Sequence, residues 1–283
     1  MTALSTPGTI RSRRGIMFVD RMMRAARPFG VAIGYLWVTL IYIPIVWLAV
    51  MSVSSRPLTG VPYPLSLEWY DSLFSGDLRW LPPLERSLIL GIIVSVLCMI
   101  AATMVGRVLP QLRRRGGLLA AFLAPLFVPA LVTGVSMFMF YRALIGLKLG
   151  DWSLILAHFV WAFPFALLAM LVVSSRFDIR MSEAASDLGA TNWQRFWQIE
   201  VPLLRPGIIA SGFFGFLLSF NELPLSIYMR AGQMTLPLHL WAESTAHQSS
   251  IPLIYGMSTL VTFVSIIIVV VALRLLFFRK EQQ

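Results

Sequence analysis

The sequence predicts an all-α integral membrane protein with six transmembrane helices and both termini in the cytoplasm. Of its 283 residues, 58% are hydrophobic and 13% are charged, and the mean hydropathy is +0.78. A soluble domain of this length is far more polar. Six apolar stretches are long enough to cross a bilayer, which takes roughly 20 helical residues. Since lipid cannot satisfy an open backbone, each stretch is expected to be a helix.

These stretches divide the chain into a basic cytoplasmic tail (residues 1–28), a transmembrane domain (29–277) and a short cytoplasmic tail (278–283). The first stretch lacks an Ala-x-Ala cleavage site and is longer than the apolar core of a signal peptide, so we expect it to be retained. The six predicted spans are Phe29–Val53, Ser87–Val105, Gly117–Tyr141, Trp152–Ser174, Pro206–Met229 and Ile251–Leu273.

The positions of the basic residues predict the orientation. Most of the 23 Lys and Arg residues lie in the N-terminal tail, the second and fourth connections and the C-terminal end. Cytoplasmic segments carry such an excess of positive charge, so these four segments are assigned to the cytoplasm. The basic residues lie at span ends rather than on one folded face, so the net charge of +10 does not indicate nucleic-acid binding.

Residues that carry chemistry are scarce. Cys98 is the single cysteine and lies within an apolar span, and His239 and His247 are too far apart to hold a metal from adjacent helical turns. The sequence has no HExxH, no GxSxG and no phosphate loop. We therefore expect no enzymatic activity, no metal and no cofactor bound by this chain, and any nucleotide to be handled by another subunit.

One polar segment, in the fourth connection (residues 176–205), has the pattern of a helix, a turn and a second helix. Met181, Ala184, Ala185 and Leu188 are spaced at i, i+3, i+4 and i+7, which gives a narrow apolar stripe with small residues at its centre. Gly189 follows where a helix end requires a left-handed residue. Glu183 is expected at the start of this first helix, where the helix dipole favours an acid.

The second helix of this loop has an equally clear beginning. Thr191 and Gln194 have the spacing of a capping box. Trp193, Phe196 and Trp197 form an aromatic face expected to pack on the protein's own span ends, and Pro202 is expected to end the helix near the membrane. A plain connector between two spans needs only a few residues, so this long, ordered loop predicts a docking surface.

Glu183-Ala184-Ala185, Gly189 and Ile199-x-Val201-Pro202 together resemble the EAA loop of ABC importer permeases. Three flanking segments are similar to the second permease of spermidine/putrescine-type importers. They are Gly150-Asp151-Trp152-Ser153-Leu154, Ser175-Arg176-Phe177-Asp178 and Trp69-Tyr70. The resemblance implies a type I permease fold in a bacterial inner membrane, in contact with membrane lipid. It also implies three kinds of partner: a second permease, two ATP-binding subunits that use ATP and Mg²⁺, and a periplasmic solute-binding protein.

The same resemblance assigns residues to two roles within the loop. The residues expected to contact the ATPase are Glu183, Ala184, Ala185, Asp187 and Gly189. Those expected to hold the loop in shape are Thr191, Gln194, Ile199 and Pro202. ATP binding to the partners would move the loop, and the spans would alternate between inward-open and outward-open states.

A group in the predicted fifth span suggests a transport pathway for a small cationic solute such as a polyamine. Asn221, Glu222 and Pro224 lie close together there, and acids within membranes usually face a cavity or a partner. Pairing with a neighbouring helix, or reaching the outer interface, is an equally open interpretation of Glu222. The other candidates are Tyr228, Tyr141 and Trp161; for Tyr141 and Trp161, lining and packing roles both remain open.

Two alternatives follow from the same residues. A permease of this class could carry an opine, an amino acid derivative or an aminophosphonate instead, because Asn221 stands where similar polyamine permeases often have a second acid. An ATP-independent secondary transporter would show two related halves and several charges near the midplane, and the sequence shows neither.

Overall fold

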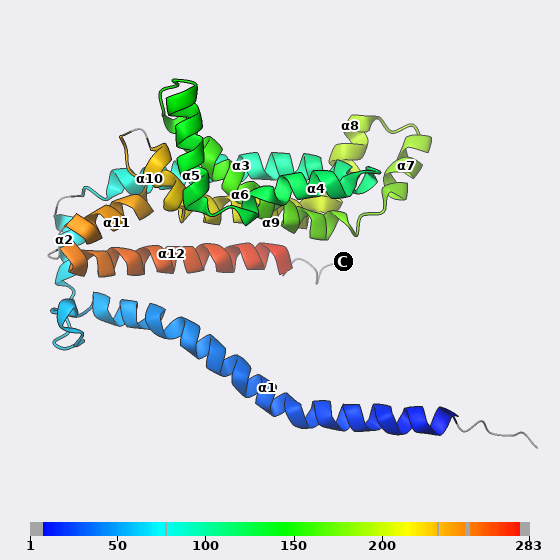
Figure 1. The fold of residues 1–283 in the computed structure, drawn as a ribbon, viewed down its shortest axis with the longest axis horizontal. Coiled ribbons are helices and arrows are strands. Elements are labelled where there is room, and N and C mark those ends of the chain that lie inside the picture. Colours follow the sequence, from blue (N-terminus) through cyan, green and yellow to red (C-terminus); the bar gives the residue numbers. More distant parts are fainter. Residues whose placement is uncertain (1–7, 77, 231, 247–249, 278–283) are drawn as a thin grey trace, which may run out of the picture. The chain divides into compact units, whose positions relative to one another are not determined.

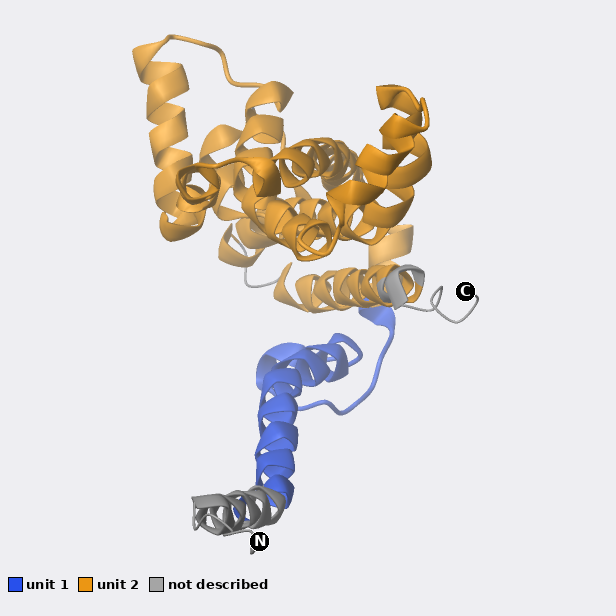
Figure 2. Cartoon of the chain, turned by 90° about the vertical axis from the view of Figure 1, so that its right-hand side faces the viewer, with its two compact units in different colours: residues 1–69 blue, residues 70–283 orange. Residues whose placement is uncertain are grey.

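The structure is a computed structural model that describes residues 8–76, 78–230, 232–246 and 250–277. Apart from one antiparallel bridge between Ser54 and Leu65, these residues form helices and the turns between them. The chain divides into two compact units, residues 1–69 and 70–283, which are coloured separately in Figure 2. The C-terminal tail predicted at 278–283 lies outside the described residues.

The first unit contains one long helix, α1 (Gly8–Ser52), and the 3-10 turn η1 (Pro57–Thr59). The apolar part of α1, Arg27–Ser52, matches the predicted first span. The helix already begins at Gly8, so most of the predicted basic tail is part of α1. After α1 the chain reverses, and the indole Nε1 of Trp69 donates a hydrogen bond to the carbonyl oxygen of Ser54 at 2.7 Å.

The second unit is built around three helices that pack on one another: α3 (Leu81–Val108), α6 (Asp151–Ser174) and α9 (Val201–Phe220) (Figure 1). Small residues line their contacts, as is usual between membrane helices. Ser95 Oγ of α3 donates to the Gly212 carbonyl of α9 at 2.7 Å, and Ser211 Oγ of α9 donates to the Ala166 carbonyl of α6 at 2.8 Å. These close contacts hold the three helices together at the centre of the second unit.

Gly215 marks a very close approach between α3 and α9. A Cβ at Gly215 would lie 2.9 Å from the Cβ of Cys98 and 3.0 Å from the Cα of Ser95, whereas a Cβ at Gly117 of α4 would meet nothing within 4 Å. We therefore expect Gly215→Ala to lower the free energy of unfolding by about 1–3 kcal/mol through overpacking. Gly117→Ala is the matched control and should be neutral or stabilising. Thermal unfolding in detergent measures both, and equal melting temperatures would contradict the expectation.

The predicted third span is not one straight helix. It comprises α4 (Arg115–Leu123), η3 (Ala124–Phe127), α5 (Ala130–Phe138) and the π-helix η4 (Met139–Leu144), and the two halves are bent by 96°. Pro125 and Pro129 remove amide donors at the break, and Val128 before Pro129 is extended. Five other helices among the described residues are long and apolar enough to span a membrane, and the count matches the predicted six only when the bent pair is counted as one broken span.

The predicted fifth span also differs from the structure. Its helix begins before Pro206, at Val201, and α9 ends at Phe220; a separate short helix, α10 (Pro224–Met229), follows. The chain then continues through α11 (Leu236–Ala246) into the last long helix, α12 (Ile251–Phe277). The break between α9 and α10 lies at the end of the bundle where α3 and α6 begin, which is called the distal end below (Figure 1).

Candidate coupling surface and pathway residues

The predicted helix-turn-helix is present at the end of the bundle opposite the distal end (Figure 1). Its first helix, α7 (Ile179–Asp187), begins one turn earlier than predicted, because Asp178 caps it by accepting a hydrogen bond from Arg180 N at 3.0 Å. Glu183 therefore lies in the middle of α7 rather than in its first turn. The prediction that the helix dipole explains Glu183 is wrong. The Glu183 side chain is exposed, so its presence there requires a different explanation.

Gly189 ends α7 as predicted, directly after the turn that contains the exposed Asp187. Gly189 has φ of +90°, in the left-handed region that favours glycine. Gly189 N donates to the Ser186 carbonyl at 2.9 Å, and Ala190 N donates to the Ala185 carbonyl at 2.9 Å. These two bonds are the Schellman pattern, which satisfies carbonyls left open at a helix end.

Most of the apolar stripe of α7 is exposed. Leu188 is 90% exposed and Met181 is 50% exposed, while Ala184 and Glu183 are exposed and Ala185 is half-buried. A stripe that served internal packing would be buried against the bundle. The arrangement instead leaves a helix surface with small residues at its centre available to another chain.

The second helix is short and passes directly into the bundle. Thr191 and Gln194 form the predicted capping box around α8 (Asn192–Arg195), with Gln194 N donating to Thr191 Oγ1 at 3.3 Å and Thr191 N to Gln194 Oε1 at 2.8 Å. The π-helix η5 (Phe196–Glu200) then leads into α9. Pro202 thus does not end a helix. It lies in the first turn of α9, where the π-turn before it accommodates the missing amide donor.

The aromatic face of this segment is only partly covered. Trp193 is 70% exposed and Trp197 is 49% exposed, with their rings edge to face at 5.5 Å, so the predicted packing of this face on span ends is wrong for both tryptophans. Phe196 is half-buried under the guanidinium of Arg107, 5.3 Å from the ring centroid. Ile199 is half-buried too. The two tryptophans extend the surface that α7 leaves open.

Sequence reasoning missed the residues beneath this surface: Glu200, Arg107 and Ser182. Glu200 is 2% exposed and Ser182 is 3% exposed. A signal was available, since Glu200 is an acid in an apolar run that enters the membrane, where an unpaired charge is costly. Its partners lie far away in the sequence, so spacing could not name them.

At the distal end, Glu222 lies in the break between α9 and α10 rather than on a continuous helix. The side chain is buried, and its Oε1 accepts a hydrogen bond from Leu225 N at 3.0 Å, which caps α10. Asn221 is exposed, and its Nδ2 donates to the Leu217 carbonyl at 2.9 Å. Glu222 therefore has a structural task that the sequence pattern does not indicate.

His158 of α6 holds both sides of this break. It is fully buried, with Nδ1 3.0 Å from Ser219 Oγ of α9 and Nε2 2.9 Å from Ser226 Oγ of α10. Ser226 Oγ donates its hydrogen to the Glu222 carbonyl. With that hydrogen committed to the carbonyl, Nε2–H of His158 is assigned as the donor to Ser226 Oγ, and Ser219 Oγ is the hydrogen-bond partner of Nδ1.

The remaining pathway candidates pack against neighbours. Tyr141 lies in η4 with its ring edge to face on Trp152 at 5.3 Å, and Trp161 packs on Phe165 at 5.9 Å. Tyr228 of α10 lies where α5 comes close, since a Cβ at Gly134 would be 3.3 Å from its ring. All three are half-buried, so a lining role for them stays a prediction.

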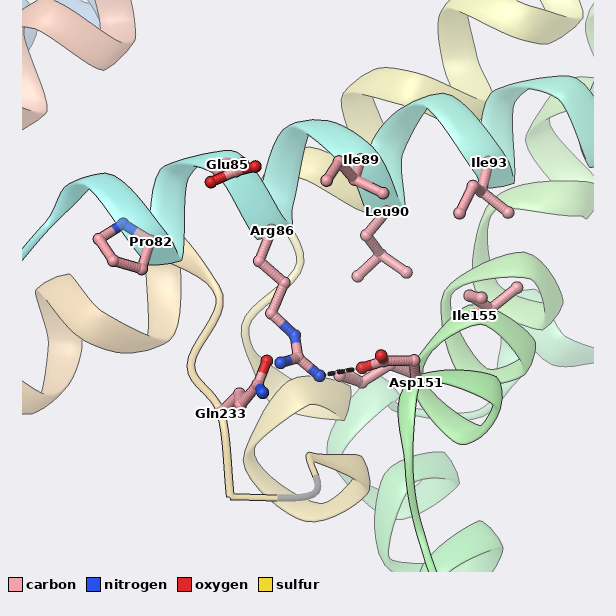
Figure 3. Close-up of a pocket in the computed structure, with 10 residues that line it drawn as sticks. Pro82, Glu85, Arg86, Ile89, Leu90, Ile93, Asp151, Ile155 and Gln233 are labelled. Carbon is pink, nitrogen blue, oxygen red and sulfur yellow. Dashed lines mark hydrogen bonds and ion pairs between the residues drawn. The ribbon is translucent and has the colours of Figure 1, made fainter.

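A pocket of about 340 Å³ lies between the beginnings of α3 and α6 (Figure 3). Arg86 of α3 reaches across it to form an ion pair with Asp151, the first residue of α6. Figure 3 shows the Arg86 side chain between Gln233 and Asp151, with Glu85 on the same helix. The Asp151 side chain is 77% exposed, so a carboxylate faces the open part of the pocket.

Capping of α10 and direct contact with the solute, the two roles suggested for Glu222, predict different results for Glu222→Gln. Glutamine keeps a carbonyl oxygen for Leu225 N, whereas leucine removes the cap. On the capping role we expect Glu222→Gln to retain transport within about threefold and Glu222→Leu to be about 0.5–2 kcal/mol less stable. Initial rates of uptake and thermal unfolding measure the two effects. A large increase in KM for Glu222→Gln alone would instead support direct contact with a cationic solute.

A bundle of apolar helices long enough to span a bilayer, with a helix-turn-helix exposed at one end, is the architecture of an integral membrane protein. Residues 99–280 match the family described as "Binding-protein-dependent transport system inner membrane component". The chain belongs to this family, and it is an inner-membrane permease of a binding-protein-dependent transport system. The match includes α7, α8 and the break between α9 and α10.

The chain is also similar to individual permeases. It is 27% identical to the spermidine/putrescine transport system permease protein PotC of Escherichia coli strain K12, with 81% of this chain and 87% of PotC covered. It is 30% identical to the putrescine transport system permease protein PotI of the same strain, with 83% and 85% covered. The trehalose transport system permease protein SugB of Mycobacterium tuberculosis is 28% identical, with 67% and 70% covered.

Proposed function

We propose that this chain is one of two permease subunits of an ATP-driven polyamine importer. Two ATP-binding subunits dock on the permease pair in the cytoplasm, one of them on α7, and a periplasmic binding protein delivers spermidine or putrescine. The chain itself catalyses nothing and binds no cofactor. ATP binds the partners more tightly in one conformation, and the permease pair alternates its access to the two sides of the membrane as a result.

The similarity to PotC and PotI over four fifths of the chain carries the choice of solute. The exposed stripe of α7 supports the docking of an ATPase, since Met181, Ala184 and Leu188 are uncovered within the described part of the protein. At the distal end the exposed Glu85 suits a cation approaching from that side, whereas Asp151 is already paired with Arg86. The similarity to SugB makes a sugar the second candidate.

Reconstitution tests the proposal. The permease pair, the ATPase subunits and the cognate binding protein are placed in proteoliposomes, and uptake of radiolabelled putrescine, spermidine and trehalose is measured with and without ATP on the side of the ATPase. ATP-dependent uptake of a polyamine, with no uptake of trehalose, is expected. Uptake of trehalose and of neither polyamine would show that the solute is a sugar. Uptake by this chain alone, without ATPase or ATP, would show a secondary transporter.

A further inference from the structure

Glu200 is a buried carboxylate that connects three parts of the second unit. It is the last residue of η5, immediately before α9. Arg107 Nη2 of α3 donates to Glu200 Oε1 at 3.0 Å, and Arg107 Nε forms an ion pair with Oε2. Ser182 Oγ of α7 donates to the same Oε1 at 2.9 Å. Glu200, Arg107 and Ser182 are called the Glu200 clamp below.

Two further contacts hold the clamp in place. The Arg107 guanidinium lies over the Phe196 ring, in a cation–π contact. Arg195 Nη1 of α8 donates to the Ser182 carbonyl at 3.3 Å, so the backbone of α7 is held as well as its side chain. A two-point contact between a guanidinium and a carboxylate fixes the orientation of both groups, which a single charge contact does not.

The position of Ser182 makes this connection mechanically important. Within α7, all of whose residues the structure describes, Ser182 is the one buried side chain. Met181 and Glu183 on either side of it are exposed. A displacement of α7 by a protein docked on its exposed face is therefore transmitted to the bundle through the hydrogen bond between Ser182 and Glu200. The backbone at the two ends of the loop is a second connection.

We infer that Glu200 is a positioning residue that transmits movement of α7 to α3 and α9. This inference rests on the proposed function, because it takes α7 to be the surface on which the ATPase acts. Glu200 is buried, so it touches neither the ATPase nor the solute. It makes α7, η5 and the end of α3 move together, so that nucleotide-driven displacement of the loop changes the packing of the bundle rather than bending the loop alone.

The test is the number of solute molecules transported per ATP hydrolysed by the complete reconstituted assembly, with radiolabelled putrescine as the probe. Glu200→Gln keeps the size of the side chain and an oxygen for Ser182 but loses the ion pair. Ser182→Ala leaves the ion pair and the Arg195 contact to the backbone of α7, and removes the side-chain hydrogen bond between α7 and Glu200. Arg107→Lys keeps the charge without the two-point contact. Arg113→Gln, which changes an exposed arginine of the connection after α3, is the matched control.

The transport-to-ATP ratio is expected to fall about 5- to 100-fold in Glu200→Gln, less in Ser182→Ala and Arg107→Lys, and not in Arg113→Gln. A merely structural role would reduce the amount of assembly and leave the ratio unchanged. A wild-type ratio in both Glu200→Gln and Ser182→Ala would overturn the inference. If Glu200→Gln does not assemble, Ser182→Ala decides alone, because it retains the buried ion pair.

A second readout separates this inference from the proposed function. Spin labels on α3 and α6 report the ATP-induced change in distance between these helices, and this measurement needs no transported solute. Loss of the change in Ser182→Ala supports the clamp, and a wild-type change contradicts it, even where wild-type assembly fails to take up putrescine. Such a failure in uptake would count against the proposed solute only.

Discussion

Gly189→Val is expected to abolish ATP-driven uptake while the protein remains in the membrane. Gly189 has φ of +90°, and a β-branched residue adopts this conformation only at a cost of about 1–3 kcal/mol. A Cβ at this position would meet nothing within 4 Å, so the effect is one of backbone conformation and not of a clash. The chain can relieve the strain by unwinding the last turn of α7, which displaces Ala184, Ala185 and Leu188 from the surface that we assign to the ATPase.

Gly146→Val is the matched control for this prediction. Gly146 also has positive φ, at 77°, and a Cβ added there would also meet no atom within 4 Å, but it lies in the turn between η4 and α6. Both variants carry a similar local strain. We expect ATPase subunits to co-purify with Gly146→Val at the wild-type ratio and to be reduced at least tenfold with Gly189→Val, a loss of about 1.4 kcal/mol or more in binding. Equal co-purification of the ATPase subunits with the two variants would show that α7 is not part of the docking surface.

Local patterns in the sequence predict the helix-turn-helix of residues 176–205 well. The left-handed Gly189 and the capping box of Thr191 and Gln194 depend on residues within a few positions of each other, so their spacing contains the necessary information. The apolar stripe places the start of α7 too late, because Asp178, the true cap, lies before the first residue of the stripe. Length and hydropathy likewise locate the five spans that are long helices, since each is a property of one continuous stretch, but they do not indicate the 96° bend in the third predicted span.

Contacts between distant residues could not be predicted. Glu200 and Arg107 are 93 positions apart, and His158 is 61 positions from Ser219. The sequence gives no sign that α9 ends at Phe220, because Pro224 fits either a bend in a long helix or the first turn of a new one. The prediction of a pathway role for Glu222 assumes the long helix, whereas the structure shows this side chain capping α10.

The break between α9 and α10 leads to the second large effect, which concerns stability. His158→Leu is expected to lower the free energy of unfolding by about 2–4 kcal/mol. The substitution leaves the buried Ser219 hydroxyl without its partner, at a cost of about 1–3 kcal/mol, and removes the donor to the oxygen of Ser226, whose own hydrogen still goes to the Glu222 carbonyl. Thermal unfolding of the purified protein in detergent, with denaturant titration where unfolding is reversible, measures the loss.

A double-mutant cycle distinguishes the hydrogen bonds from simple loss of packing at His158. Ser219→Ala alone removes one partner, and the double variant His158→Leu with Ser219→Ala leaves no unpaired group at that contact. Removing both partners of a buried hydrogen bond leaves no unpaired polar group. The loss in free energy of unfolding for the double variant should therefore be smaller, by about 1 kcal/mol or more, than the sum of the losses for the two single variants. Additive losses would mean that His158 fills space and does not hold the two helices across the break. Non-additive losses would show that α6 fixes the relative position of α9 and α10, and with it the site of Glu222 at the distal end.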